Sequence, residues 1–576
     1  MNPVAYRIKI GVTGHRSGLP EKDLLMNAIR NAIGFEDWKK NKTVKNNSIL
    51  SLFGEKSIEE FRKVKTTPIA FSILSALAEG ADRIVAETVL EIESSTIEVV
   101  LPLTEEDYRN DFISDDSKKE FEKYLKQDYH PVRLRSHNLS EQYKQSDIPE
   151  MRRESYFNAG KYIVDNCDVL IAIWDGDDSK RKGGTSEVVE YAKKNNRNTI
   201  IISSKNPTDI QLRNFDSLNA ESISQIEFFN EQIIRSPIDE KYLKELYKGY
   251  FGKEKISKIE NHDNAMLQFL KEELLPYYII GSSSAKKFQS LYKRSGLAAY
   301  WLSTLAVISV IFSVVFNQFQ IISFTIEFIS LIFILIIITV AQNKRAHKNW
   351  LENRFLVERI RIAPFFFLCG QEVIQPKALF YDRNKKNSQP WMFNVFSEIW
   401  NELNRKWHVK NNQKNVHHSF SKDLVDFINE SWVMDQLAYH EKNVVKKKWW
   451  NKFLERGIKI IFFTAMISAG MHICLAISEM ENDYISLVEK ILTVIALSFP
   501  VIAAALEGVR RHKEYSRNAE RSEWMAEALK IKSEKLNAVK DEKEFYELLK
   551  ETDKLMLQES QDWMMLMIPT ELEYVT

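Results

Sequence analysis

The sequence predicts two kinds of architecture in one chain. A doubly wound, mostly parallel α/β sheet comes first, and an all-α membrane region with four transmembrane helices in two repeated hairpins follows. Three observations predict this. Short β-branched runs alternate with amphipathic stretches over about the first 205 residues. Four apolar blocks then come near the length that crosses a bilayer. Two charged stretches that follow these blocks match each other in sequence.

The expected strands are apolar, several of them throughout, which is typical of strands buried on both faces of a parallel sheet. The segments between them, such as 81–92 and 184–194, have the helical period that is needed to cover such a sheet. We expect strands at 8–13, 68–74, 96–103, 168–174 and 199–203.

Composition excludes several classes of protein. The 576 residues are too many for one compact core, and 80 basic against 79 acidic side chains leave a net charge of +1. We therefore expect no direct binding of nucleic acid. Cys167, Cys369 and Cys474 lie far apart, so they predict neither a disulfide framework nor a zinc site. The N-terminus lacks the apolar region of a cleaved secretion signal.

Four apolar blocks predict the two membrane hairpins. The first hairpin pairs 298–316 with 321–342, which is interrupted only by Glu327, and the second pairs 460–477 with 491–506. Blocks near 16 residues also suit buried core helices of a large soluble protein. Because all four blocks occur in pairs and obey the charge rule described next, membrane insertion is the favoured interpretation.

Lysine and arginine residues precede and follow each hairpin. The outer parts of the hairpins carry Glu327 in the first, and Glu479, Glu481, Asp483, Glu489 and a single Lys490 in the second. Positive residues near short loops stay on the cytoplasmic side, so both termini and the α/β domain are expected in the cytosol. The flanking cations are Lys286, Lys287, Lys293, Arg294, Lys344, Arg345, Lys348, Lys446, Lys447, Lys448, Lys452, Arg456, Arg510, Arg511 and Lys513.

An internal duplication relates the helices that leave the membrane. At an offset of 165 residues, five of six compared positions are identical, and the sixth exchanges one aromatic residue for another. The pairs are Arg345 and Arg510, His347 and His512, Lys348 and Lys513, Trp350 and Tyr515, Asn353 and Asn518, and Glu358 and Glu523.

Three residues within the spans are candidates for function. Glu327 either lines a pore or gate, or reaches the outer interface with its side chain, which is the interpretation we prefer. His472 lies in the third span, where its simplest role is a hydrogen bond to a neighbouring helix. Pro500 is expected to kink its helix, in the service of either gating or packing.

The first expected strand ends in a turn that suits an anion. Glycine at Gly11 and Gly14 permits close backbone approach, a helix follows with free N–H groups, and Arg16 is able to pair with phosphate. Thr13 and His15 complete this group of candidates. The alternative is an ordinary strand-to-helix turn in which Arg16 is solvated.

The second turn again places glycine beside charged residues, at the carboxyl end of a strand, where open α/β sheets bind ligands. Its candidates are Glu79, Gly80, Asp82 and Arg83. In isolation, Asp82 is equally well explained as the N-cap of the following helix.

The third turn is the strongest signal because its parts lie close together. A buried strand ends in Asp175 and Gly176, a basic loop follows, and a helix opens at paired glycines. Amides at a helix N-terminus and a hydroxyl suit phosphate, and an acidic side chain suits ribose hydroxyls. A capped helix after a loop is the alternative. The candidates after the loop are Gly183, Gly184, Thr185, Ser186 and Glu187.

These segments resemble the SLOG superfamily, the Rossmann-like relatives of the LOG nucleotide phosphoribohydrolases and of DprA. The resemblance covers about 200 residues in chain order, and it implies a Rossmann-like fold that senses a nucleotide-derived signal. The segments that carry it are GVTGHR (11–16), ALAEGADRIVAETV (76–89), VVLPLTEEDYRNDF (99–112), and DVLIAIWDG (168–176) with KGGTSEVVEYA (182–192).

The membrane part resembles SLATT-type effectors, two-helix hairpins found beside SLOG domains in prokaryotic defence islands. The marks are WVMDQLAYH (432–440) and the Arg-His-Lys-aromatic helices after the second and fourth spans. The resemblance implies a bacterial inner-membrane effector of antiviral defence that disrupts the membrane when the SLOG domain binds its signal. The implied ligand is a nucleotide or an ADP-ribose-type molecule, made by a separately encoded nucleotidyltransferase or TIR-type enzyme, with no cofactor and no metal.

One departure from the family bears on catalysis. LOG enzymes carry a PGGxGTxxE loop whose glutamate serves N-glycosidic cleavage, whereas 182–187 lacks the proline and one glycine, and Glu187 lies closer. Ligand binding tolerates this departure better than catalysis does, so Glu187 is a weak catalytic candidate. A membrane-anchored LOG-like nucleotide N-glycosidase is the alternative function, and a constitutive channel is a third.

These interpretations divide the chain into five parts. Since four spans enclose little water, we also expect a homo-oligomer to form any pore in the lipid bilayer. The parts are a SLOG domain at 1–215, a helical connector at 216–296, a first hairpin module at 297–364, a cytosolic connector at 365–430, and a second hairpin module with a C-terminal helix at 431–576.

Overall fold

The computed structural model divides the chain into two compact units. The first unit comprises Met1–Pro237 and Lys377–Asn415, and the second comprises Ile238–Pro376 and Val416–Thr576. The structure describes residues 1–40, 47–53, 66–128, 131–177, 184–213, 220–235, 238–251, 260–374, 390–411, 420–477 and 483–567.

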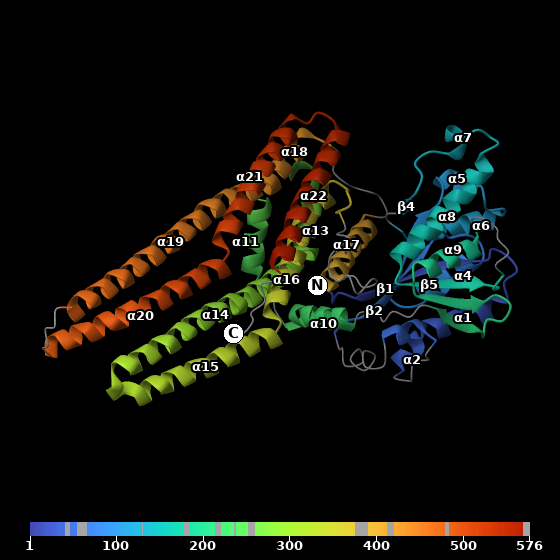
Figure 1. Ribbon diagram of the computed structural model, residues 1–576. Helices are drawn as coiled ribbons and strands as arrows, with labels where there is room; N and C mark the ends of the chain where they lie inside the picture. The colour runs from blue at the N-terminus through green and yellow to red at the C-terminus, as the bar shows by residue number, and fades with distance from the viewer. Residues whose placement is uncertain are drawn as a thin grey trace. The chain divides into compact units, whose positions relative to one another are not determined.

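A seven-stranded sheet forms the centre of the first unit (Figure 1). Its strand order is β4-β3-β2-β1-β5-β6-β7. Neighbouring strands are parallel, except that β7 runs antiparallel to β6. The prediction of a doubly wound, mostly parallel sheet is therefore confirmed. The strands are β1 (Tyr6–Gly14), β2 (Ile69–Ser75), β3 (Thr96–Leu101), β4 (Val132–Arg133), β5 (Val169–Trp174), β6 (Thr199–Ser203) and β7 (Ile210–Arg213).

Helices cover both faces of the sheet. Helices α1 (Lys22–Ile33) and α4 (Ala81–Leu90) pack against each other, as do α8 (Ile148–Asn166) and α9 (Thr185–Lys194). Because parallel crossovers are right-handed and the strand order reverses at β1, the two pairs lie on opposite faces. The remaining short helices are α2 (Phe35–Lys39), η1 (Ile49–Phe53), α5 (Glu105–Arg109), α6 (Asp115–Leu125) and α7 (Leu139–Gln142).

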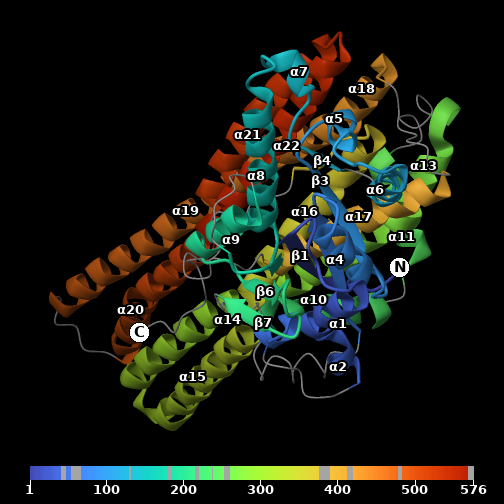
Figure 2. The same cartoon turned by 90° about the vertical axis from the view of Figure 1, so that its right-hand side faces the viewer.

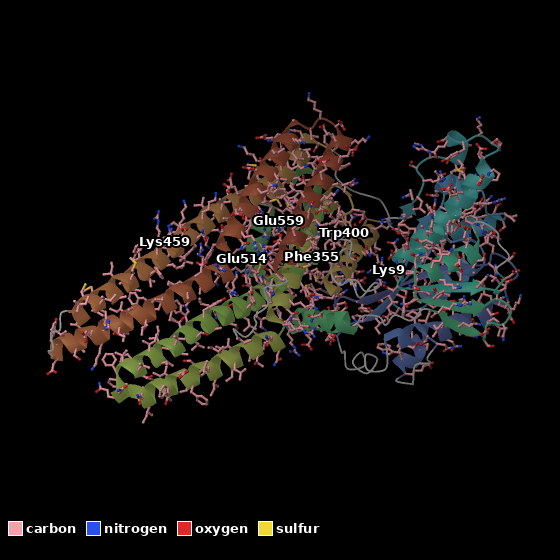
Figure 3. All side chains as sticks on the ribbon, viewed as in Figure 1. Lys9, Phe355, Trp400, Lys459, Glu514 and Glu559 are labelled. Carbon is pink, nitrogen blue, oxygen red and sulfur yellow. The ribbon has the colours of Figure 1, made fainter. Side chains whose placement is uncertain are left out.

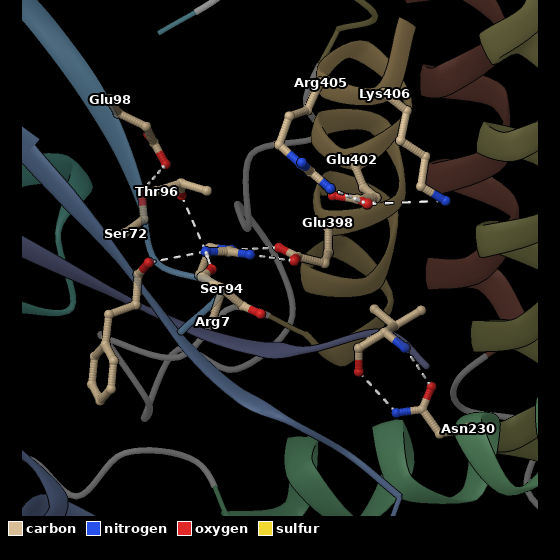
Figure 4. Close-up of polar contacts among 12 residues, drawn as sticks. Arg7, Ser72, Ser94, Thr96, Glu98, Asn230, Glu398, Glu402, Arg405 and Lys406 are labelled. Atoms are coloured by element: carbon tan, nitrogen blue, oxygen red, sulfur yellow. Dashed lines mark hydrogen bonds and ion pairs between the residues drawn. The ribbon is translucent and has the colours of Figure 1, made fainter. Parts of the chain in front are cut away.

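Two later helices complete the first unit. Helix α10 (Ala220–Arg235) fixes the N-terminal segment, because Asn230 exchanges two hydrogen bonds of 2.8 Å with the backbone of Val4. Helix α17 (Trp391–Lys410) packs on β1, where Arg7 pairs with Glu398 (Figure 4). The sequence placed these helices in connectors at 216–296 and 365–430; the structure places both in the unit that contains the sheet.

The second unit is all-helical, and two antiparallel hairpins dominate it. Helices α14 and α15 lie side by side, as do α19 and α20 (Figures 1 and 2). The helices are α11 (Glu240–Phe251), α13 (Glu260–Glu273), α14 (Leu275–Val315), η2 (Asn317–Phe319), α15 (Gln320–Asn343), α16 (Ala346–Leu368), α18 (Lys422–Ile428), η3 (Asn429–Val433), α19 (Met434–Ile477), α20 (Asp483–His512), α21 (Tyr515–Ala538) and α22 (Glu542–Met567).

Four of these helical stretches are long and apolar enough to cross a membrane, as the sequence predicted. Only 11 to 22 % of the residues in their apolar windows are buried within the chain. The exposed apolar side chains of these helices are therefore expected to contact lipid or another copy of the chain. Glu327 lies in α15, His472 in α19, and Pro500 inside α20, all within these stretches.

The two hairpins end in the same backbone break. Arg345, between α15 and α16, has φ 44° and ψ 44°, and Glu514, between α20 and α21, has φ 47° and ψ 43° (Glu514 is labelled in Figure 3). An asparagine four residues later donates a side-chain hydrogen bond to the break, Asn349 to Lys344 O and Asn518 to Glu514 O. The breaks are 169 residues apart, about one helical turn more than the offset of 165 found in the sequence.

A buried ion pair holds α22 to α16 within the second unit. Asp553 accepts hydrogen bonds from Arg359 Nη1 at 2.6 Å and from Arg359 Nη2 at 3.1 Å. The two side chains are 2 % and 0 % exposed. The carboxylate also accepts from Ile374 N, so its charge is well solvated by the protein.

Candidate functional site

A cleft of about 530 Å³ opens at the carboxyl ends of β1 and β5. The strand order reverses between these two strands, and open α/β sheets bind ligands at such a reversal. All three turns singled out in the sequence contribute to its lining, together with α8. The predicted candidates that line it are Thr13, Gly14, His15, Arg16, Asp82, Asp175, Gly184, Thr185 and Ser186.

The first turn is shaped by close backbone contacts. A Cβ atom at Gly14 would lie 2.4 Å from Ala81 Cβ, so only glycine lets β1 end this close to α4. His15 N donates to Ile173 O at 3.2 Å, and His15 O accepts from Ala81 N at 3.1 Å. These two hydrogen bonds hold the turn against the end of β5 and the start of α4.

The side chain of Arg16 is exposed and faces an aromatic ring of α8. Its guanidinium carbon lies 5.3 Å from the centroid of the Tyr156 ring. The Tyr156 hydroxyl donates a short hydrogen bond to Asp111, and Arg152 bonds the same carboxylate at 2.6 Å. Tyr156 is thus held in place, and it presents a fixed ring beside the cation.

Asp82 brings a buried carboxyl to the cleft wall. The residue is 6 % exposed, and its Oδ2 accepts hydrogen bonds of 3.3 Å from Ser75 Oγ and from Ala78 N. Burial raises the pKa of the Asp82 carboxyl to about 7, although the Ala78 N–H and the nearby Arg16 charge favour the ionised form. Near neutral pH this group therefore exists in both protonation states.

The third turn adds an acid and a helix N-terminus. The pKa of Asp175 is held below its ordinary value by the Asp177 N–H, and by His15, whose Nε2 lies 3.3 Å from the carboxylate. Helix α9 begins at Thr185, and its N-cap residue Gly184 has no side chain to bond the N–H groups of the first turn. Its first turn therefore offers hydrogen-bond donors to an anion in the cleft.

Several predicted residues lie elsewhere. Arg83 is 4 % exposed and turned toward α6, where it bonds Ser117 and Glu120. Glu79 accepts a hydrogen bond from the same Ser117. Neither residue lines the cleft.

Three glycines and one glutamate also lie outside the lining. Gly11 faces α8, where a Cβ would meet Cys167 Sγ at 2.8 Å. Gly80 has φ +82°, and a Cβ there would lie 2.5 Å from Arg16 O, so it supports the first turn from behind. Gly176 and Glu187 flank the third turn without contributing to the lining. Gly183 falls outside the described residues.

Helix α8 supplies a wall of the cleft that was not among the residues predicted from the sequence. Tyr156, Ala159, Gly160 and Ile163 line the cleft from this helix, and Tyr108 joins them from α5. A Cβ at Gly160 would lie 2.4 Å from Val188 Cγ2, so this small residue lets α9 approach α8. The small pair Ala159 and Gly160 within an amphipathic helix was the available signal.

Taken together, the cleft is lined by the Arg16 guanidinium, the start of α9, several hydroxyl-bearing side chains and the carboxyls of Asp82, Asp175 and Asp177. Such a set suits a ligand with both phosphate and sugar hydroxyl groups. Among the described residues, no group of three potential metal ligands occurs. Neither family models, curated proteins nor solved structures gave a match to this chain.

Proposed function

We propose that this protein is a ligand-gated membrane effector whose α/β unit binds a nucleotide-derived messenger. The observation that carries the proposal is the cleft at the reversal of the strand order, where Arg16, Asp175 and the start of α9 meet. Arg16 and the α9 amides bind the phosphate groups of the messenger, and Asp175 accepts hydrogen bonds from its ribose. A nucleotide or an ADP-ribose derivative has both kinds of group.

The output of the protein is a change in the membrane. The chain passes between the two units at 237–238, 376–377 and 415–416, so the sheet unit is covalently joined to both hairpins. Ligand binding shifts the equilibrium between states of a homo-oligomer in a bacterial inner membrane, and the spans then open or disrupt the bilayer. A swing from 1:99 to 99:1 requires about 5.5 kcal/mol of differential affinity, which several subunits supply jointly.

A thermal-shift screen tests the binding step. Because α17 belongs to the sheet unit, the full chain is used, with linear and cyclic nucleotides and ADP-ribose derivatives. Arg16→Ala is expected to abolish the stabilisation by the ligand. Arg109→Ala is the matched control, since Arg109 is 52 % exposed and pairs with Glu122 outside the cleft. An Arg16→Ala protein that responds normally would overturn the assigned phosphate role.

Dye-loaded vesicles test the output. Vesicles that carry the inserted full chain are expected to leak when the stabilising nucleotide is added and to stay sealed without it. Leakage without ligand supports a constitutive channel instead. Vesicles that stay sealed at saturating ligand contradict the effector proposal.

One observation favours the rival enzymatic function. A carboxyl with a pKa near 7 in a cleft wall is suited to general acid or base chemistry, and Asp82 has this property. Steady release of free base from nucleoside monophosphates, lost in Asp82→Asn, would identify a membrane-anchored N-glycosidase. The position of Glu187 outside the cleft lining supports binding over cleavage.

A further inference from the structure

Three lysines of the second unit come together from three different helical segments. Lys293 lies on α14, Lys447 lies on α19, and Lys513 lies between α20 and Glu514. Both hairpin modules therefore contribute to the group. The charges that act most strongly on Lys293 are those of Lys447, Lys513, Arg354 and Lys446, all of them positive.

Lys293, Lys447 and Lys513 are half-buried, and no carboxylate of the described residues pairs with them. Their partners are neutral: Lys293 Nζ lies 5.2 Å from the Trp350 ring, and Lys447 Nζ lies 5.3 Å from the Tyr515 ring. The Gln289 amide, turned so that its oxygen faces Lys293 Nζ, accepts a hydrogen bond at 3.0 Å.

Like charges that are removed from water and left without a partner are unfavourable. The neighbouring Lys448, in contrast, has a carboxylate partner, because it pairs with Glu523 at 2.8 Å. The arrangement of Lys293, Lys447 and Lys513 is therefore one that a bound anion would stabilise.

The surroundings of the lysines indicate which anion is available. On α19, the exposed rings of Trp449 and Trp450 follow Lys447 and Lys448 in the sequence, and on α14 the exposed Trp301 follows Lys293 by about two turns. Exposed tryptophans next to lysines mark the headgroup level of a membrane. Basic pockets between spans at this level bind phospholipid headgroups.

Stacked aromatic rings pack next to Lys293 and Lys513. Tyr292, the neighbour of Lys293, stacks on His347 at 4.4 Å and contacts His512 at 5.0 Å. A Cβ at Gly296 would lie 2.5 Å from His512 Nε2, so α14 and α20 approach closely here. The lysines thus project from a packed junction of the two modules.

We propose that Lys293, Lys447 and Lys513 bind the phosphate headgroup of an anionic phospholipid where the two hairpin modules meet. This inference rests on the proposed insertion of the four apolar helices into a bilayer. The lipid supplies the missing negative charge and links the first hairpin to the second.

The test uses the full chain in nanodiscs of phosphatidylcholine alone or of an equimolar mixture with phosphatidylglycerol. Phosphatidylglycerol is expected to raise the unfolding temperature of the wild type by several degrees, and native mass spectrometry should find it retained. The triple variant Lys293→Gln, Lys447→Gln, Lys513→Gln should lose this shift and bind the lipid about 100-fold more weakly, as expected for three juxtamembrane charges. In phosphatidylcholine alone it should be at least as stable as the wild type, because the repulsion is gone.

A matched control removes the same charge from the same helices. Lys286→Gln, Lys452→Gln, Arg511→Gln changes three exposed cations on α14, α19 and α20, and it should keep the phosphatidylglycerol shift. Equal loss in both triple variants, or loss in neither, would overturn the proposed site. If the first triple variant unfolds, Lys513→Gln alone is expected to lose about a third of the shift.

Two further arms separate the possible failures. Inorganic phosphate added to phosphatidylcholine discs should give no shift, and a shift as large as that of phosphatidylglycerol would replace the lipid by a soluble phosphate. Wild-type protein that enters neither kind of disc would contradict the membrane insertion itself. Protein that enters both with no preference contradicts only the lipid site.

Discussion

Arg7 on β1 and Glu398 on α17 form a two-pronged ion pair across 391 residues of sequence. Arg7 Nε donates to Glu398 Oε2 at 2.6 Å, and Arg7 Nη2 donates to Glu398 Oε1 at 2.5 Å (Figure 4). The remaining Arg7 nitrogen bonds Phe71 O, Ser94 O and Thr96. The first hairpin is therefore an insertion between two parts of one folded unit.

Removal of Glu398 is expected to loosen β1. The Arg7 and Glu398 side chains are 14 % and 12 % exposed, so Glu398→Ala leaves an unpaired guanidinium that is largely buried. We expect a cost of about 3 kcal/mol to the local stability, measured as faster amide exchange in residues 6–14. Glu402→Ala, one turn away on α17, is the control. It removes an ion pair with Arg405, whose side chain is 43 % exposed, and it should cost less than about 1 kcal/mol. Equal exchange in both variants would contradict the role given to Glu398.

The pair of Arg359 and Asp553 should be the most sensitive charged contact of the second unit. Asp553→Ala leaves the guanidinium buried and short of its main partner, at a cost of about 3 to 5 kcal/mol. Amide exchange in α16 and α22 measures this. Glu551→Ala is the control. Glu551 pairs with Lys532, but the Glu551 side chain is 61 % exposed, so this variant should change the exchange little. A replacement of both partners, Arg359→Met with Asp553→Leu, should recover most of the loss.

Asp82 predicts a specific pH dependence. Its folded pKa of about 7 lies above its ordinary value of 3.8, so the folded protein binds more protons between these values. This carboxyl therefore contributes stability that is fully present below about pH 4 and is lost as the pH rises through about 7. Asp82→Asn should remove roughly 1 to 4 kcal/mol of this pH dependence and be the more stable protein at pH 8. Thermal melts between pH 4 and 8 check this, and an unchanged profile would contradict the assignment.

Glu514 has left-handed backbone angles, so glycine should be favoured over alanine at this position, the reverse of the usual order within a helix. At φ 47°, glycine is unstrained, whereas alanine pays about 1 kcal/mol, so Glu514→Gly should be more stable than Glu514→Ala. Both variants lose the same ion pair with Arg517, so their difference reports the backbone alone. At Glu527, an exposed position within α21, alanine should instead be better by about 1 kcal/mol. The same order at both positions would show that the break is not maintained.

Much of the fold followed from local patterns in the sequence. The five predicted strands coincide with β1, β2, β3, β5 and β6 to within a few residues, because apolar β-branched runs leave few alternatives to a buried strand. The two strands that were missed, β4 and β7, have two and four residues, too few for a pattern. The turns at Arg16, Asp82 and Asp175 could be predicted because each lies where an apolar run ends close to a glycine, which is a local signal of a turn.

By itself, then, the sequence determined the order of elements, the four apolar spans and the residues at the strand ends, since each depends on neighbours a few positions away. Only the tertiary structure decided that α17 returns to β1 through Arg7, that Tyr156 forms the wall facing Arg16, and that Arg83 turns away toward Ser117. It also located the two helix breaks, at Arg345 and Glu514. These features depend on which distant surfaces pack together, and a short-range pattern of polarity does not encode that choice.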